Sequence, residues 1–169
     1  SSKSSKLAER FLEDFQTKFN FANKADWGYT TIHKIETSNN EPLIYKRIET
    51  DILKVEFVNG IKPNSKVEFN LNYIIKPPSS KFNGYGINSS KNLYLKEWLI
   101  LPALYLNNKW EYYSNKNIND QFVEPFSIDF EFDVPKKYNV FSELDETEKN
   151  EFNSKKIIRF KGNSITETK

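Results

Sequence analysis

With 169 residues, the chain is long enough to bury an apolar core without help from disulfides or a structural metal. It contains no cysteine, which excludes disulfide bonds, thiol catalysis and thiolate metal sites. The net charge of +2 is too small to indicate a nucleic-acid partner by electrostatics alone. Because most apolar residues are aromatic or β-branched, the composition favours β-strands over helices.

The chain also lacks methionine, and it opens with a polar run of serines and lysines over residues 1–6. Because translation starts with methionine, we interpret the chain as a piece of a longer protein. Residues 1–6 are then a linker, and residues 7–169 form a single β-domain. No stretch approaches the roughly 18 apolar residues that a membrane-spanning helix needs, so we expect no membrane span in this segment.

The first predicted element is a helix near the start of the chain. Leu7, Phe11 and Phe15 recur four residues apart, which is the spacing of one helix face. Ser4 or Ser5 precedes them and can cap the first turn. We interpret the apolar stripe as a face that packs on the body of the domain.

From Trp27 onward the apolar period changes to two, the period of β-strands. Strands are predicted at 28–36, 43–48, 52–58, 66–75, 93–106, 126–134, 138–141 and 156–160. Turns and loops are predicted at 58–65, 79–90, 107–109, 114–120 and 135–138, and a loop or short surface helix at 143–151. Many short strands and one N-terminal helix predict an all-β fold, either a curved antiparallel sheet or a β-sandwich.

Two of the predicted strands differ in character. The run from Leu93 to Leu106 is apolar apart from Lys96 and Glu97, so we expect it to be buried on both faces, with Pro102 at a bulge or edge. The run 126–134 alternates strictly between apolar and polar residues, which predicts one buried and one solvated face.

His33 is the sole histidine, so neither a histidine-based zinc site nor a paired-histidine relay can form within this chain. It lies in the middle of a predicted strand, between Ile32 and Lys34. We interpret it as an exposed or hydrogen-bonded strand residue and not as a catalytic one.

Three carboxylates, Asp129, Glu131 and Asp133, project from one face of a predicted strand. Closely set carboxylates can bind calcium or share a proton, but the same spacing serves a solvated sheet face. We favour the second interpretation and expect lysines on a neighbouring strand to neutralise them. A second acidic group lacks the glycine and the ligand spacing of an EF-hand loop, and it comprises Glu143, Asp145, Glu146 and Glu148.

Six aromatic residues gather between positions 94 and 113, and rings of this kind can stack on sugars or bases. They are Tyr94, Trp98, Tyr105, Trp110, Tyr112 and Tyr113. No arginine-rich surface accompanies them, so core packing is the preferred interpretation and nucleic acid is not an expected partner. The chain has no Gly-rich phosphate loop, nucleophile elbow or HExxH motif, and we assign no catalytic, cofactor-binding or metal residue.

An ordered set of short segments runs from Trp27 to Ile165. They are Trp27-Gly28-Tyr29, the turn 61–65 before a long strand, the prolines that end this strand, Phe82-Asn83-Gly84-Tyr85-Gly86, Trp98, the segment 102–105, Asn108-Lys109-Trp110 and the segment 128–138. Their order and spacing resemble the N-terminal β-domain of aminopeptidase N-like (gluzincin) zinc metallopeptidases. More narrowly, they resemble the bacterial membrane-associated branch of that family.

The resemblance implies a curved, saddle-like antiparallel sheet that packs against a separate thermolysin-like catalytic domain. In that family the zinc ligands, the general-base glutamate and the GAMEN motif belong to the later domain, and none of them occurs in this chain. The N-terminal domain usually contributes a Gln or Glu that reads the substrate's free amine. No stretch here matches the motif around that residue, so none is assigned.

The resemblance therefore implies a non-catalytic N-terminal domain that walls the substrate cavity and supports the catalytic domain, and we expect that this chain itself is not an enzyme. The expected partners are the catalytic domain of the parent chain and, through it, a peptide substrate. This chain holds no cofactor, zinc is expected in the catalytic domain, and the parent implies an extracytoplasmic or membrane-associated location. The alternative is a free-standing β-sandwich module of a surface protein that binds carbohydrate or protein through the aromatic cluster. A scaffold domain in a membrane transporter complex overlaps with the first hypothesis.

Overall fold

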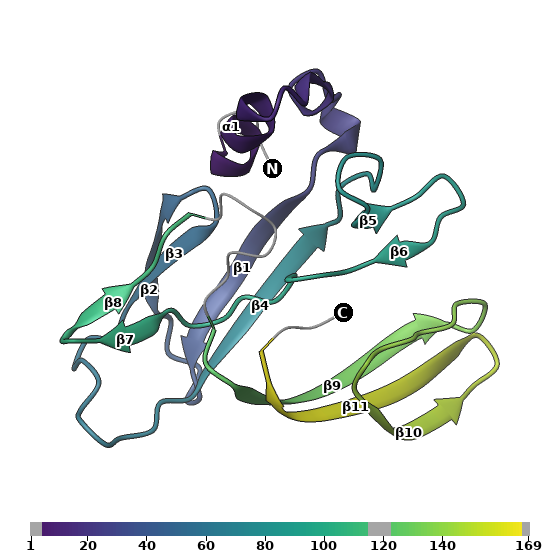
Figure 1. Ribbon diagram of the computed structural model, residues 1–169. Helices are drawn as coiled ribbons and strands as arrows, with labels where there is room; N and C mark the ends of the chain where they lie inside the picture. Colours follow the sequence, from purple (N-terminus) through teal and green to yellow (C-terminus); the bar gives the residue numbers. More distant parts are fainter. Residues whose placement is uncertain (1–4, 115–122, 167–169) are drawn as a thin grey trace. The chain divides into compact units, whose positions relative to one another are not determined.

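The computed structural model describes residues 5–114 and 123–166 of the chain (Figure 1). The chain divides into two compact units. The first comprises Ser1–Tyr94 with Tyr112–Asp120, and the second comprises Leu95–Glu111 with Gln121–Lys169. The predicted loop at 114–120 lies outside the described residues except for Ser114. That residues 7–169 form a single domain stays a prediction.

The all-β class is confirmed, because strands form most of the regular structure and every named strand pair is antiparallel. The first unit contains α1 (Lys6–Glu13), the 3-10 turns η1 (Thr17–Phe19) and η2 (Lys24–Asp26), β1 (Tyr29–Thr37), β2 (Ile44–Glu49), β3 (Ile52–Glu56), β4 (Phe69–Lys76), β5 (Gly86–Ile87) and β6 (Leu93–Tyr94). The second unit contains β7 (Leu104–Leu106), β8 (Lys109–Glu111), β9 (Phe126–Pro135), β10 (Asp145–Glu151) and β11 (Lys155–Ile165). The saddle-like or sandwich arrangement stays a prediction.

Helix α1 begins at the predicted place but ends earlier than its apolar stripe. Ser5 caps it, with its Oγ accepting a hydrogen bond from the backbone N–H of Ala8 at 3.2 Å. Phe15 does not belong to the helix: its φ is +58° and its side chain is 91% exposed. The N–H of Gln16 donates to the carbonyl of Phe11 at 2.7 Å, so the chain leaves the helix through a left-handed residue and carries Phe15 off the predicted face.

Strands β1 and β4 form a two-stranded sheet with a bulge between Ile32 and Lys34. Ile32 and Ile35 are three residues apart, an odd spacing that would place them on opposite faces of a regular strand. The bulge inserts one extra residue, His33, so that both isoleucines reach the same face, opposite Tyr73 and Leu71 of β4. Ile35 is 3% exposed and is part of the core.

Strands β2 and β3 form a hairpin that Arg47 fastens to β1. The Arg47 guanidinium donates to the carbonyl of Thr50 at 2.5 Å and to the carbonyl of Thr30, in β1, at 3.1 Å. The predicted turn after β3 is confirmed, because Gly60 and Asn64 both adopt positive φ and no strand interrupts residues 57–68.

The predicted strand at 93–106 is wrong. Only its two ends are strands: β6 pairs with β5, and β7 pairs with β8. Glu97 has a φ of +50°, outside the extended range of a strand, and Pro102 lacks the N–H that a strand ladder requires. Strand β5 also lies within the predicted loop at 79–90, because a partner in β6 supplies its hydrogen bonds.

The predicted turn before Trp110 is confirmed. Asn107 and Asn108 have φ values of +50° and +62°, and they join β7 to β8 as a two-residue loop. Positive φ at both positions is what a type I′ hairpin requires, and asparagine tolerates it better than most residues.

The second unit contains a three-stranded sheet of order β10-β11-β9 (Figure 1). The alternating pattern of β9 is confirmed, and β11 extends the predicted strand at 156–160. The predicted loop or helix at 143–151 is wrong, since most of it forms the edge strand β10. All seven residues of β10 are exposed, so no apolar alternation reveals it, and β11 supplies its hydrogen bonds. The predicted strand at 138–141 is also wrong, because none of these residues lies in a strand. The side chain of Asn139 accepts a hydrogen bond from the Lys156 ammonium at 3.1 Å.

The core of the described residues is thin. Its buried apolar side chains are Ala8, Ile35, Leu43, Ile158 and Phe160. No large side chain in the described ranges is fully buried. None of the helices described there is long and apolar enough to cross a membrane.

Candidate functional site

In the first unit, three segments of the ordered set cross at Pro78. A Cβ atom added to Gly28 would lie 2.7 Å from the Cδ of Pro78, and one added to Gly86 would lie 2.0 Å from the Pro78 carbonyl oxygen. Both distances are shorter than van der Waals contact, so only glycine fits at either position. The N–H of Ile87 donates to that same carbonyl oxygen at 2.8 Å. Segments far apart in sequence thus pack backbone to backbone here.

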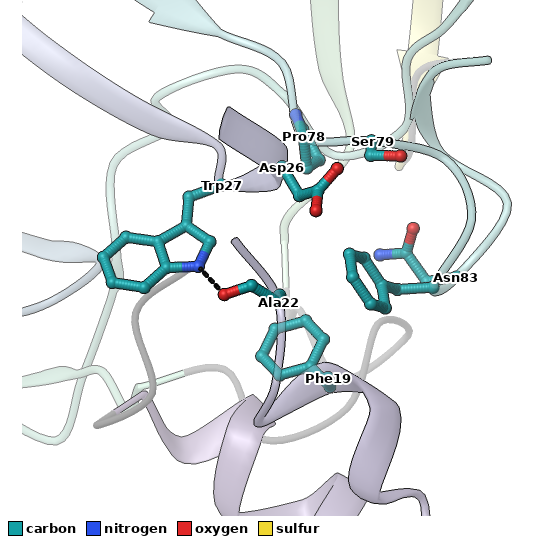
Figure 2. A pocket seen from close by; sticks show the side chains of 8 residues that line it. Phe19, Ala22, Asp26, Trp27, Pro78, Ser79 and Asn83 are labelled. Atoms are coloured by element: carbon teal, nitrogen blue, oxygen red, sulfur yellow. Dashed lines mark hydrogen bonds between the residues drawn. The ribbon is translucent and has the colours of Figure 1, made fainter. Parts of the chain in front are cut away.

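A small pocket lies beside this crossing (Figure 2). Its volume is about 20 Å³, and its lining residues are Phe19, Ala22, Asp26, Trp27, Pro78, Ser79, Phe82 and Asn83. Trp27 closes one side, with its indole N–H donating to the carbonyl of Ala22 at 3.2 Å. The space suffices for about one water molecule and is far smaller than a typical ligand pocket.

The charged groups near the pocket are already paired. The Lys81 ammonium lies 2.7 Å from the Asp26 carboxylate and 5.0 Å from the centre of the Phe82 ring. The hydrogen bond from Lys81 lowers the pKa of the Asp26 carboxyl and keeps it ionised. The ammonium of Lys76 donates to the carbonyls of Ala25 and Trp27 at 2.7 and 2.5 Å, which fastens η2 to β4. These contacts are structural.

In the second unit, Trp98 covers the apolar face of β9. Its ring stacks on Phe130, with the centroids 5.3 Å apart and the planes 22° apart, and it lies 6.4 Å from Phe132. Phe132 continues the cluster to Phe160 of β11 at 5.8 Å. Core packing, the preferred interpretation of the aromatic residues, therefore holds for Trp98.

The six predicted aromatic residues are divided between the two units. Tyr94, Tyr112 and Tyr113 belong to the first unit, and the other three belong to the second. Tyr105 and Trp110 face each other across the β7–β8 hairpin, edge to face, with ring centroids 5.0 Å apart. Both side chains are about half exposed, so this pair is available to a ligand.

Two of the three β9 carboxylates, Asp129 and Asp133, have basic partners on β11, as expected for those two. Arg159 binds Asp129 with two hydrogen bonds, of 2.6 and 2.7 Å, and Lys161 approaches the same carboxylate at 3.2 Å. The hydrogen bonds from Arg159 are the main cause that lowers the pKa of Asp129 to about 2. Lys155 pairs with Asp133 at 2.5 Å. Arg159 was not foreseen as a partner, although its alternation with Lys155 and Lys161 was visible in the sequence.

The structure gives neither His33 nor the acidic run a metal site. His33 is exposed at the β1 bulge. The carboxylates of the acidic run lie on or just before the exposed strand β10. Within residues 5–114 and 123–166, no three His, Cys, Asp or Glu side chains are placed to hold a metal ion.

Two buried charged residues were missed by sequence reasoning. Glu36 is 7% exposed, and its Oε2 lies 2.5 Å from the ammonium of Lys34 without a well-directed hydrogen bond. Lys156 is 5% exposed and donates to Asn139. Lys156 shares the face of Ile158 and Phe160, so the alternation of β11 did signal its burial, whereas Glu36 directly follows Ile35 and alternation places it on the opposite face.

Comparisons of the chain with models of known protein families, with curated proteins and with solved structures gave no match. The resemblance to zinc aminopeptidases therefore stays a prediction from the order of the segments in the sequence.

Proposed function

We propose that this chain is a non-catalytic β-domain of a zinc aminopeptidase-like protein, which walls the substrate cavity and supports a separate catalytic domain. The observation that carries the proposal is where the short segments that resemble the peptidase family lie in the fold. Three of the segments in the first unit meet at the crossing of Gly28, Pro78 and Gly86, and in the second unit Trp98 stacks on Phe130 of the segment 128–138. Residues of this kind hold a fold and perform no chemistry, which is the role that the segments have in a supporting domain.

The charged groups support the same proposal. The Asp26 and Asp129 carboxylates are ionised and paired with lysine or arginine. A general acid or base needs a pKa near the working pH, whereas both pKa values are lowered. These groups are therefore unsuited to proton transfer near neutral pH.

The thin core suits a domain that packs against another. Several large apolar side chains are exposed, among them Ile44 at 68%, Val58 at 92% and Ile74 at 57%. Exposed apolar surface of this kind often marks a contact with a partner. Under the proposal the partner is the catalytic domain, which holds the zinc and the peptide substrate, and the parent protein is extracytoplasmic or membrane-associated.

Two measurements test the proposal. The purified chain should contain no stoichiometric zinc by elemental analysis and should not hydrolyse aminoacyl p-nitroanilides. The gene that encodes the chain should encode an HExxH motif followed by a downstream glutamate in the same reading frame. Zinc binding or hydrolysis by this chain, or a gene without that motif, would contradict the proposal.

A free-standing carbohydrate-binding or protein-binding module is the second candidate, and the exposed pair of Tyr105 and Trp110 is the observation that favours it. Specific binding on a glycan array that is lost in Trp110→Ala would support this function. Trp98 is no longer a candidate for stacking, since its ring packs on β9.

A further inference from the structure

The chain contains two Asn-Gly pairs, Asn59-Gly60 and Asn83-Gly84. In such a pair the backbone nitrogen of the glycine can attack the Cγ of the asparagine side chain, because glycine has no Cβ atom to crowd the approach. Asparagine is therefore one of the thermolabile residues of proteins. Whether a given pair reacts in a folded protein depends on how readily the segment around it opens. The structure gives the two pairs different surroundings.

Hydrogen bonds hold the pair Asn83-Gly84 in place. The Asn83 Oδ1 accepts a hydrogen bond from the backbone N–H of Tyr85 at 3.0 Å, and the N–H of Gly84 donates to the carbonyl of Ser80 at 2.8 Å. Asn83 is also part-buried and lines the small pocket beside Pro78 (Figure 2). Because the side-chain amide and the attacking nitrogen are both engaged, a reaction at this pair requires local unfolding around the pocket.

The pair Asn59-Gly60 lies in the exposed connection between β3 and β4. Residues 58–68 are all exposed, and no strand interrupts them. The Asn59 side chain has no hydrogen bond with a residue that the structure describes. The N–H of Gly60 donates to the carbonyl of Phe57 at 2.9 Å within the same turn, so opening this bond breaks no strand pairing. A Cβ atom added to Gly60 would meet nothing within 4 Å, so the space around the turn is free.

We propose that Asn59 is a site of spontaneous deamidation in the folded protein and that Asn83 is protected. In this reaction the Gly60 nitrogen forms a bond to the Asn59 Cγ, and the side-chain amide nitrogen leaves as ammonia with the proton of the Gly60 N–H. Water then opens the succinimide ring at either carbonyl, which gives aspartate or isoaspartate. Only water is consumed, and nothing is oxidised or reduced. This inference does not depend on the peptidase proposal.

The reaction changes both the charge and the backbone of the connection between β3 and β4. Each event replaces a neutral amide by a carboxylate that is ionised at neutral pH, so the formal net charge falls by one, from +2 to +1. Isoaspartate also adds a carbon atom to the main chain, and the free space around Gly60 accommodates it. We therefore expect the modified chain to stay folded and to accumulate as the protein ages.

Incubation of the whole folded chain at mildly alkaline pH, followed by tryptic peptide mapping with mass spectrometry, tests the proposal. Peptide 55–66 contains Asn59, peptide 82–91 contains Asn83, and fragmentation separates each from the second asparagine of its peptide. We expect a mass gain of about 1 Da at Asn59, at a rate about tenfold or more above that at Asn83, whose hydrogen bonds must break first. A sample digested without incubation corrects for deamidation during the digest.

The unfolded chain and one variant separate the effect of structure from that of sequence. In guanidinium chloride the two pairs should react at similar rates, since each is an Asn-Gly pair. Gly60→Ala should slow the reaction at Asn59, because the added Cβ crowds the attacking nitrogen, and should leave Asn83 unchanged. Equal rates at the two pairs in the folded chain, no reaction at Asn59, or a difference that persists in guanidinium chloride would overturn the proposal.

Discussion

At the scale of single residues, pairing across strands decides what the carboxylates do. Asp129, Glu131 and Asp133 share one face of β9, but their surroundings differ. Asp129 receives two hydrogen bonds from Arg159, whereas Glu131 has no ion pair with a described residue. Carboxylates on one strand face therefore do not form one binding site here, because the basic side chains of β11 pair with individual carboxylates.

The Asp129 pair predicts a dependence of stability on acid. The pKa of Asp129 is about 2 in the folded protein against an ordinary value of 3.8. A lowered pKa stabilises the folded state above the ordinary value, and this stabilisation is lost as the pH falls from about 4 to about 2. The effect is small, since both side chains are about 40% exposed.

Thermal unfolding of Asp129→Asn across that pH range measures the effect. The variant should have a lower Tm than the parent at about pH 7 and a much smaller Tm difference at about pH 2, where about half of Asp129 is protonated. Glu131→Gln is the control and should follow the parent at each pH. A constant Tm difference between Asp129→Asn and the parent would show that the pair does not act through its charge.

At the scale of elements, close backbone approach limits which residues the turns accept. Gly86 and Gly60 both have positive φ, at +108° and +62°, so both are strained by a side chain. They differ in space: a Cβ at Gly86 would collide with Pro78, while one at Gly60 would meet nothing within 4 Å. The two glycines thus separate conformational strain from steric collision.

Gly86→Ala should therefore destabilise the chain far more than Gly60→Ala. We expect a loss of about 3 kcal/mol or more at Gly86, and about 1 kcal/mol at Gly60, where only the left-handed backbone opposes alanine. Urea unfolding of both variants measures the two free energies of unfolding. Equal losses would mean that β5 can move away from Pro78 at little cost.

At the scale of the whole molecule, the two units are interleaved in sequence. Residues 95–111 of the second unit interrupt the first, and Tyr112–Asp120 returns to the first. Neither unit is therefore one continuous segment, and the folding of each closes a loop that runs through the other. We expect such units to unfold together, which is what the prediction of a single domain at 7–169 requires.

Single-tryptophan variants measure that cooperativity. Trp98→Phe/Trp110→Phe leaves Trp27 to report on the first unit, and Trp27→Phe/Trp110→Phe leaves Trp98 to report on the second. Each variant should show the same urea midpoint by tryptophan fluorescence as by circular dichroism, which follows the whole chain. A fluorescence transition apart from the circular dichroism transition would show that the units unfold separately and that the chain contains two domains.

Local patterns were enough to predict several parts of the fold. Strict alternation predicted β9, a capping serine placed the start of α1, and two adjacent asparagines marked the β7–β8 turn. Each of these three features depends on the conformational preferences of residues that are neighbours in the sequence, so it can be predicted from the sequence alone. The candidate site was predicted in the same limited sense: the order of its segments was visible, and their meeting at Pro78 was not.

The sequence by itself determined the all-β class and the absence of cysteine chemistry, because composition and period depend only on residue types. Tertiary structure decided the rest. It made a strand of the acidic run at 145–151, since β11 supplies hydrogen bonds that no local pattern reveals. It also broke the apolar run at 93–106 and assigned its two ends to different units. Pairing between distant segments overrides a short apolar run, because each backbone N–H and C=O needs a partner wherever that partner lies in the chain.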